Sequence, residues 1–344
     1  MRKSVLELSA ISAISGREKA VRDWLLQELK NAPAARWVRV DRVGNVIVEL
    51  EGRQAAPRRV LFAAHMDEVG GIVTDITADG YLRFDCVGSI VAEALFGHRV
   101  TVNGHVGVIG GKAIHQCQGD AKTKVPSKDT MVIDIGAASR EEAEAVCKAG
   151  DAVYFTDEVD LLGESRYVSK ALDDRAGCAL LLSLAKTRPQ YDVIIAFTVR
   201  EEIGHGGANA VAFAAEPDIA VAVDVTTAAD VMETPESKQV CRMGGGPVVS
   251  FMDRATMYDK PLFDEIFRLA AENGIEAQTK HVIAGGNDAA SLQTAGAGSR
   301  VAAVSLPCRY LHTASCVLDD ADVENTRRLL EVMMNTLPAW DDTL

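Results

Sequence analysis

The sequence predicts an α/β fold in which a layered α/β domain, formed by both ends of the chain, carries a small β-rich insertion. Helical and strand-like segments alternate from about residue 168 onward, which is typical of a largely parallel sheet covered by helices. Between about residues 70 and 165, short β-like runs are instead separated by Gly, Asp and Asn. We therefore place the α/β domain at 1–69 and 166–344, and the inserted domain at 70–165.

The N-terminal segment predicts a helix, a hairpin and a buried strand in that order. Apolar residues recur at helical spacing from Ala20 to Leu29, and Ser15 with Glu18 would form a capping box before them. Alternating segments at 37–40 and 45–50 predict the hairpin. The continuous apolar run 60–64 predicts a strand that is buried on both faces.

The remaining elements follow the same patterns. In the insertion we expect strands within 70–76, 81–87, 98–104, 105–111 and 130–136 and one helix near 141–148. After it we expect helices at 175–186, 208–215, 261–272 and 321–337, and strands at 193–199, 219–225 and 301–306.

Composition excludes several classes of function. The 344 residues carry a formal charge of −13, which argues against nucleic acid and anionic membranes as partners. Apolar runs are too short to span a bilayer, and the N-terminus lacks the apolar core of a signal peptide. The seven cysteines form no CxxC pair, so neither a disulfide framework nor a thiolate zinc site is expected. These features predict a cytoplasmic protein.

Residues that commonly bind metals lie at the ends of the predicted elements of the α/β domain. In chain order they are His65, Asp67, Asp173, Asp174, Glu201, Glu202, Asp224 and His312. Each alone is more often a turn, capping or surface residue. Because ligands of open α/β sheets bind beyond the carboxyl ends of the strands, we expect these side chains to converge. Imidazoles and carboxylates suit zinc, cobalt or manganese, and two such cations would neutralise the shared negative charge.

Two of the motifs have a direct chemical interpretation. Asp67, two residues after His65, can accept a hydrogen bond from the imidazole nitrogen that does not face a metal. Glu201 and Glu202 are consecutive at a strand end, so their side chains point in opposite directions. One carboxylate can then bind a metal while the other acts as a general base toward water.

The chain resembles the dinuclear metallo-aminopeptidases of the tetrahedral, deblocking and glutamyl aminopeptidase type, some of which were formerly called endoglucanases. The resemblance rests on AHMDEVGGIV, SKALDDRAG, TVREEIGHGGA, AVDVT, GGNDAASLQ and CRYLHTASCVLDDADVENT, and it extends from about residue 5 to residue 337. It implies a zinc-exopeptidase-like α/β/α catalytic domain with a barrel-like β insertion that serves oligomerisation.

The resemblance also implies a role for each motif residue. Asp173 would bridge two divalent metal ions, zinc in the first place and cobalt or manganese as alternatives. His65 and Asp224 would complete one site, and Glu202 and His312 the other. Glu201 would be the general base and Asp67 the residue that orients His65. The peptide after the bridging aspartate would be cis.

An aminopeptidase reaction follows from these roles. The substrates would be short peptides with a free N-terminus, and the chain would self-associate into a dodecamer built from dimers. His115 is a candidate to approach the active site of a neighbouring subunit. His205 and Asn287 are further candidates for contact with substrate, where the sequence departs from the family pattern.

Three alternatives remain open from the sequence. They are a related dinuclear deacylase or carboxypeptidase, a glycoside hydrolase, and a non-catalytic scaffold that retains the metal fold. A glycoside hydrolase would need opposed carboxylates beside aromatic platforms, and aromatic residues make up only 5% of this chain.

Overall fold

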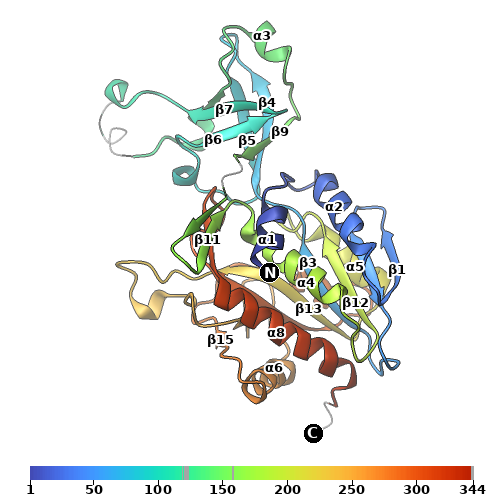
Figure 1. Ribbon diagram of the computed structural model, residues 1–344. Helices are drawn as coiled ribbons and strands as arrows, with labels where there is room; N and C mark the ends of the chain where they lie inside the picture. The colour runs from blue at the N-terminus through green and yellow to red at the C-terminus, as the bar shows by residue number, and fades with distance from the viewer. Residues whose placement is uncertain (118, 120–123, 157–158, 342–344) are drawn as a thin grey trace.

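The protein has a layered α/β domain with a closed β barrel beside it (Figure 1). The computed structural model describes residues 1–117, 119, 124–156 and 159–341. The central sheet contains β1 (Ala35–Val40), β2 (Val46–Leu50), β3 (Val60–His65), β12 (Val193–Thr198), β13 (Ile219–Thr227), β14 (Val248–Val249), β15 (Gln278–Thr279) and β16 (Arg300–Cys308). Their order is β1-β2-β12-β3-β13-β16-β14-β15.

The four middle strands β12, β3, β13 and β16 are parallel, and the antiparallel strands lie at the two sides of the sheet. The register pairs Thr198 with His65, and Asp224 with Ser305. Parallel strands in register bring their carboxyl ends to one edge, so residues that follow β3, β12 and β16 lie at the same edge as the end of β13.

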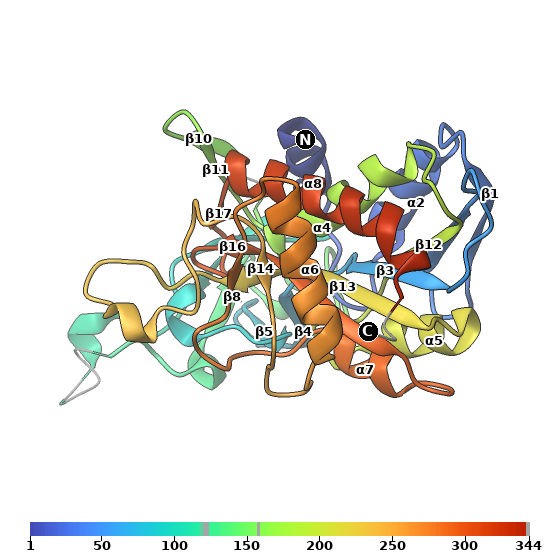
Figure 2. The ribbon, with the colours of Figure 1, turned by 90° about the horizontal axis from the view of Figure 1, so that it is seen from below.

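Helices cover both faces of this sheet. They are α1 (Arg2–Ser9), α2 (Lys19–Leu29), α4 (Leu172–Ala185), α5 (Gly206–Ala215), α6 (Lys260–Glu272), α7 (Ala289–Thr294) and α8 (Asp320–Thr336). Phe62 packs in the core on the side of α4, α6 and α8, whereas Leu61 and Ala63 pack in the core on the side of α5 and α7. Alternate residues of a strand point to opposite faces, which explains why β3 is apolar throughout. Figure 2 shows α6 and α8 crossing one face together.

The barrel is built from β4 (Gly70–Ile76), β5 (Leu82–Val87), β6 (Arg99–Val102), β7 (His105–Gly110), β8 (Val132–Asp134) and β9 (Ala152–Phe155), in the order β4-β5-β8-β7-β6-β9. It also carries α3 (Arg140–Glu144) and has its own apolar core. The barrel begins at Gly70, directly after the turn that follows β3. A Cβ at Gly70 would lie 2.5 Å from Ile14 Cγ2 and 2.7 Å from the carbonyl oxygen of Val153, so the close approach at this junction requires glycine.

The expected fold class is confirmed, and several elements differ in detail. The strands β10 (Asp160–Leu162), β11 (Arg166–Ser169) and β17 (Cys316–Asp319) form a separate three-stranded sheet that the sequence patterns did not predict. Runs of two to four residues show little periodicity, and β9, β14 and β15 were not predicted either. The division of the chain at residues 70 and 165 remains a prediction.

The capping box expected at Ser15 and Glu18 is wrong. The helix α2 begins at Lys19 without a side-chain cap, and the Glu18 carboxylate accepts a hydrogen bond from the backbone N–H of Gly16 at 2.6 Å. The Ser15 hydroxyl instead donates to the carboxylate of Asp67 at 2.6 Å. The Ser15 hydroxyl therefore forms a tertiary hydrogen bond with Asp67 in place of the local helix cap that the motif predicted.

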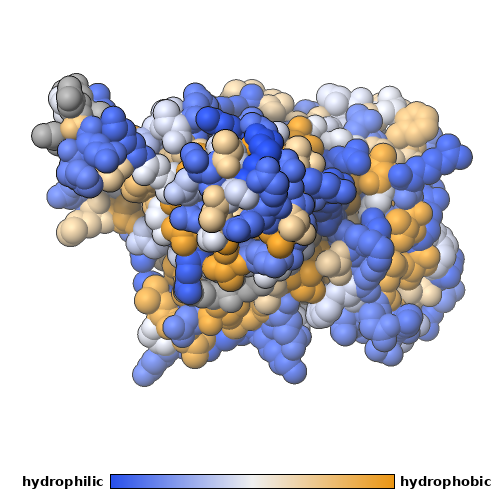
Figure 3. Space-filling view, turned by 90° about the horizontal axis from the view of Figure 1, so that it is seen from above, coloured by the Kyte–Doolittle hydropathy of each residue, from blue (hydrophilic) through white to orange (hydrophobic). Residues whose placement is uncertain are grey.

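Hydrophilic and hydrophobic residues are interspersed over the face that Figure 3 shows. Among the described residues, none of the helices has the length and apolar character needed to cross a membrane.

Candidate metal centre and active site

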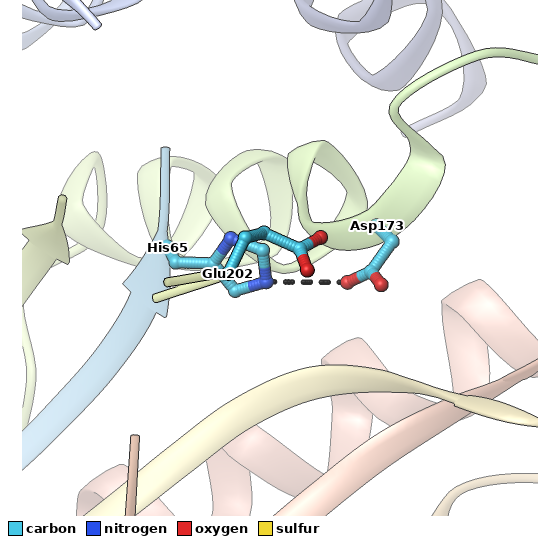
Figure 4. Close-up of side chains that lie close together, drawn as sticks. All are labelled: His65, Asp173 and Glu202. Atoms are coloured by element: carbon cyan, nitrogen blue, oxygen red, sulfur yellow. Dashed lines mark hydrogen bonds and ion pairs between the residues drawn. The ribbon is translucent and has the colours of Figure 1, made fainter. Parts of the chain in front are cut away.

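A buried cluster of imidazoles and carboxylates lies at the carboxyl edge of the parallel strands. His65 ends β3, and its Nε2 atom lies 3.2 Å from Oδ1 of Asp173 (Figure 4). The same Nε2 atom lies 3.7 Å from Oδ1 of Asp224. The Nε2 atom of His312 lies 3.3 Å from the other oxygen of Asp173 and 3.3 Å from Oε2 of Glu202. Asp173 therefore lies between two imidazoles, each of which faces a second carboxylate.

The turn after β3 fixes the orientation of the His65 ring. The Nδ1 atom of His65 lies 3.1 Å from the backbone carbonyl oxygen of Asp67 and 3.6 Å from its carboxylate. A carbonyl oxygen can only accept, so this hydrogen bond places a proton on Nδ1 and leaves Nε2 as the ring atom that faces Asp173. The nearest partner of the ring is thus the main chain of Asp67, whereas the sequence pointed to its side chain.

The carboxylate of Asp67 holds the neighbouring turn in place. It is fully buried and accepts hydrogen bonds from the backbone N–H groups of Glu201 and Glu202, at 3.1 and 3.2 Å, in addition to the Ser15 hydroxyl. Asp67 therefore links the turn after β3 to the turn after β12. This contact with the Glu201–Glu202 backbone was not anticipated from the sequence, because the two segments are far apart in the chain.

Asp173 and Asp174 lie at the start of α4 with non-helical backbone angles, and the peptide between them is cis, as expected. Ligand atoms of His65, Asp174 and Asp224 lie within 4.8 Å of one another. The carboxylate of Asp174, however, already accepts hydrogen bonds from the backbone N–H groups of His65, at 3.2 Å, and Gly177, at 3.0 Å. Asp174 is thus engaged in joining β3 to α4, and Asp173 is the aspartate that both imidazoles face.

Burial and mutual repulsion raise the pKa of most acids in the cluster. Burial, reinforced by neighbouring carboxylates, raises the pKa of Glu201 and Glu202 well above the usual value. Burial likewise raises the pKa of Asp224. Burial alone would also raise the pKa of Asp173, but hydrogen bonds from His312 and His65 outweigh it and hold that pKa low.

The pKa values of the two imidazoles are also raised, although burial acts on an imidazole in the opposite direction. Burial would lower the pKa of His312, but Asp173 and Glu202 raise it to about 10, and carboxylates similarly raise the pKa of His65. Without cations the cluster therefore holds protons to limit its negative charge.

The donor set fits divalent metal ions. Imidazole nitrogens and carboxylate oxygens are ligands for zinc and similar ions, and protons compete with cations for the same atoms. One carboxylate oxygen, Oε1 of Glu202, is buried and has no hydrogen-bond partner among the described residues. A buried acceptor left without a donor is costly in a folded protein, and a cation would satisfy it.

The cluster opens into a cavity of about 480 Å³. Glu201 lines this cavity, and its Oε1 atom lies 3.3 Å from Nε2 of His205, which also lines it. Asn287 lines the cavity too, but its side-chain oxygen Oδ1 accepts hydrogen bonds from the backbone N–H of Ala289 and the hydroxyl of Tyr258. His115 is exposed in a short 3₁₀ turn (Ile114–Gln116) and does not line the cavity of its own chain.

Residues 44–329 match the family of M42 glutamyl aminopeptidases. This chain belongs to that family. The resemblance found in the sequence is confirmed, and the protein is a metal-dependent aminopeptidase, a hydrolase of peptide bonds.

Relatives and solved structures of M42 type match nearly the whole chain. A putative aminopeptidase of Acetivibrio thermocellus is 36% identical over 94% of this chain and 95% of its own length. The lysyl aminopeptidase of Pyrococcus furiosus is 32% identical over 96% of this chain and 95% of its own.

The fold is similar to that of an aminopeptidase from Desulfurococcus kamchatkensis, with a TM-score of 0.92 and 32% identity over 97% of this chain and 94% of the other. The TET1 peptidase of Pyrococcus horikoshii, which can assemble into a tetrahedron or a large octahedral shell, has a TM-score of 0.85 and 34% identity. That match covers 97% of this chain and 99% of the other.

Proposed function

We propose that this M42 protein releases the first residue of short peptides with a free N-terminus, and that two divalent ions act in the reaction. Asp173 would bridge the ions, with His65 and Asp224 completing one site and Glu202 and His312 the other. The observation that carries the proposal is the position of Asp173, each of whose oxygens faces a different imidazole at 3.2 and 3.3 Å. The unpartnered oxygen of Glu202 supports it.

Zinc is the first candidate for both ions, with cobalt and manganese as alternatives, because borderline ions accept mixed nitrogen and oxygen ligands. When bound, two such ions would act as Lewis acids toward the scissile carbonyl and the free amine, and would neutralise the carboxylates around them.

Glu201 is the proposed general base. Its carboxylate lines the cavity, and its Oε2 atom lies 4.0 Å from Nε2 of His65. The hydrogen bond from its backbone N–H to Asp67 fixes its main chain at this edge of the sheet. A general base with a raised pKa can take a proton from the attacking water and return it to the departing amine. Asp67 positions this base and, through its carbonyl oxygen, the His65 ring.

We further propose that the chain assembles as a dodecamer built from dimers, and that the barrel contributes to the contacts. The barrel segment carries several large apolar side chains that are exposed in the single chain, among them Val91, Val106 and Val108. Exposed apolar groups of this kind favour contact with another subunit. His115 would approach the active site of such a neighbour. The expected solution mass is twelve times the 36.8 kDa of the chain, and static light scattering after gel filtration measures it.

A cytoplasmic location is consistent with the free cysteines. All seven are unpaired in the structure and five are buried, as is usual for proteins of a reducing compartment.

The activity is tested on protein stripped of metal and then supplied with Zn²⁺, Co²⁺ or Mn²⁺. Free-amine peptides, N-acetylated copies of the same peptides and β-linked oligosaccharides serve as substrates, and mass spectrometry identifies the products. Metal-restored release of the first residue from free-amine peptides alone is the expected result. Release of the last residue, cleavage of the acetyl group or cleavage of sugars would instead favour the carboxypeptidase, deacylase or glycosidase alternative.

Glu201→Gln and Glu202→Gln form a matched pair that separates the base from the ligand. Glu201→Gln should lower kcat about 10²–10⁴-fold with both ions retained, since it removes a general base. Glu202→Gln should lower the bound metal toward one ion per chain, because an amide is a weaker ligand than a carboxylate. Elemental analysis of dialysed protein, together with kcat, measures both effects. Near-normal turnover by metal-loaded Glu201→Gln would exclude the assigned role.

A further inference from the structure

The turn that carries His312 joins β16 to β17 as a hairpin. At the neck of this hairpin, Arg309 and Val317 each donate a backbone N–H to the carbonyl oxygen of the other, at 3.2 and 3.0 Å. Residues 310–316 close the hairpin, and Tyr310 and His312 have positive φ angles of 59° and 57°. Residues other than glycine rarely adopt such angles, so the position of His312 depends on how the neck holds its turn.

Two cysteines lie at this neck on one face of the hairpin. Cys308 precedes Arg309, and Cys316 precedes Val317. Successive residues of a strand point to opposite faces, and residues opposite each other in an antiparallel pair point to the same face. Cys308 and Cys316 are therefore diagonal neighbours on the face away from the side chains of the neck pair. Their thiols are in contact, with a hydrogen bond between them.

Both sulfur atoms also contact the main chain of the hairpin. The Cys308 thiol donates to the carbonyl oxygen of Arg309 at 3.3 Å. The Cys316 sulfur lies 3.5 Å from the carbonyl oxygen of Tyr310 and 3.6 Å from that of Thr313. The two cysteines are buried, but the turn that contacts them lines the active-site cavity through its next residues, Leu311 and His312. A small oxidant in this cavity therefore meets the turn that packs on the two sulfurs.

An ion pair fixes the opposite face of the neck. The Arg309 guanidinium contacts both carboxylate oxygens of Asp230, at 2.7 Å from Nε and 2.9 Å from Nη2. Asp230 also accepts a hydrogen bond from the backbone N–H of Met243 at 3.0 Å. A bidentate pair of this kind holds the guanidinium in one orientation. If the two cysteines draw together, Cys316 and the turn must therefore take up most of the movement.

We propose that Cys308 and Cys316 form a redox modification site at which a hydroperoxide joins the two thiols in a disulfide, and that this disulfide weakens metal binding by displacing His312. In the first step one thiol attacks the peroxide, takes up one oxygen as a sulfenic acid and releases an alcohol, or water from hydrogen peroxide. The other thiol then displaces water from the sulfenic acid and forms the S–S bond. The two thiols together lose two protons and two electrons, and the hydroperoxide is reduced.

Closing the disulfide must change the hairpin. The Cβ atoms of a disulfide lie about 3.5–4.5 Å apart, whereas those of diagonal neighbours in an antiparallel pair are separated by somewhat less than about 7–8 Å. The neck must therefore contract on this face, and Cys316 must leave the carbonyl oxygens of the turn. The Nε2 atom of His312, now 3.3 Å from both Asp173 and Glu202, would move away from them. This effect on the metal rests on the ligand role proposed for His312, whereas formation of the disulfide does not.

The disulfide is sought in the wild-type protein, metal-free and zinc-loaded, after treatment with hydrogen peroxide and alkylation of the remaining thiols. Trypsin cleaves after Arg300, Arg309 and Arg327, so the two cysteines lie on separate peptides, 301–309 and 310–327. Mass spectrometry without reduction should find these peptides linked, and a small-molecule thiol should separate them. The link should form more slowly in the zinc-loaded protein, because an ion held by His312 keeps the turn in place.

Metal content and turnover measure the consequence. Oxidised wild type should retain about one ion per chain in place of two, and its kcat on free-amine peptides should fall about 10- to 100-fold, the usual cost of disturbing the groups that orient a metal ligand. Reduction and added zinc should restore both. The double variant Cys308→Ala/Cys316→Ala should keep the metal content and kcat of its own untreated sample. Cys147→Ala, which removes a buried thiol of the barrel, should respond like wild type.

The outcomes separate this inference from the proposed function. Oxidation of other thiols without a link between peptides 301–309 and 310–327 would overturn the inference. A link that leaves metal content and kcat unchanged, or an equal loss of metal from the double variant, would also overturn it. If untreated, zinc-loaded wild type releases no first residue from any peptide, the aminopeptidase function fails, and the link and the metal content still decide the inference.

Discussion

His205 contacts the proposed base from outside the metal cluster. Its Nε2 atom lies 3.3 Å from Glu201 Oε1, and its backbone has a positive φ of 60°. The loop residue that the sequence singled out as a departure from the family pattern therefore lies against the carboxylate of the proposed base. A partner at this distance can orient the carboxylate toward the water that it deprotonates.

We expect His205→Ala to lower kcat about 10-fold or more, with unchanged metal content and little change in thermal stability. The physical reason is that Glu201 loses the contact that limits its rotation. His205→Gln, which can donate one hydrogen bond, should recover part of the rate. Steady-state kinetics with elemental analysis measures the effect. A variant that alters KM alone would instead indicate that His205 contacts the substrate and does not position the base.

A buried ionic cluster links the elements that carry the site. Glu68 follows β3, Lys170 precedes α4 and Arg175 lies within α4, and all three are almost fully buried. The Lys170 ammonium lies 2.9 Å from both carboxylate oxygens of Glu68. Arg175 donates to the backbone carbonyl oxygens of Leu8, Ile11, Ala13 and Met66. The segment after α1, the turn after β3 and the start of α4 are thus held together by charge-assisted hydrogen bonds.

Lys170→Met should lower the free energy of unfolding by about 3–5 kcal/mol, the usual cost of leaving one partner of a buried ion pair uncompensated. Chemical denaturation of the metal-loaded protein measures this change. Lys170→Met combined with Glu68→Gln should cost less than the sum of the two single changes, because the second change removes the unpaired charge. Additive costs would show that the two side chains do not stabilise the fold as a pair. Lys3→Met, which removes the positive charge of an exposed lysine, provides the control for loss of charge alone.

At the scale of the whole molecule, the proposed metal centre joins elements that are distant in the chain. His65 ends β3, Asp173 begins α4, Glu202 follows β12 and His312 follows β16. Ions held between these residues would stabilise the folded chain, because the unfolded chain cannot bring the ligands together.

Added Zn²⁺ should raise Tm, and the rise should be larger at pH 8 than at pH 6. His312, whose pKa is raised to about 10 without metal, must lose its proton to bind an ion. Glu202 and Asp224, whose pKa values are also raised, are ligands only when ionised. At lower pH, protons therefore compete more strongly with the metal ion for His312, Glu202 and Asp224. Scanning fluorimetry measures Tm, and titration calorimetry in buffers of different ionisation enthalpy should detect released protons. Calorimetry that shows no proton release at pH 7 would contradict this coupling.

The sequence by itself determined the fold class and the family, and it supplied the residues that we propose for the metal centre. Periodicity predicts most of the longer helices and strands, and motifs such as His65-x-Asp67 and Glu201-Glu202 have a clear chemical interpretation at strand ends. Sequence reasoning could also state that these side chains would converge, because parallel strands share one carboxyl edge.

Only the tertiary structure decided what each side chain contacts. It showed that the Asp67 carboxylate holds the Glu201–Glu202 turn and that Ser15 donates to Asp67 rather than capping a helix. These contacts join segments separated by tens to hundreds of residues. Local patterns carry no information about such pairings, since the hydrogen-bond partner of a buried polar group is set by how the elements pack.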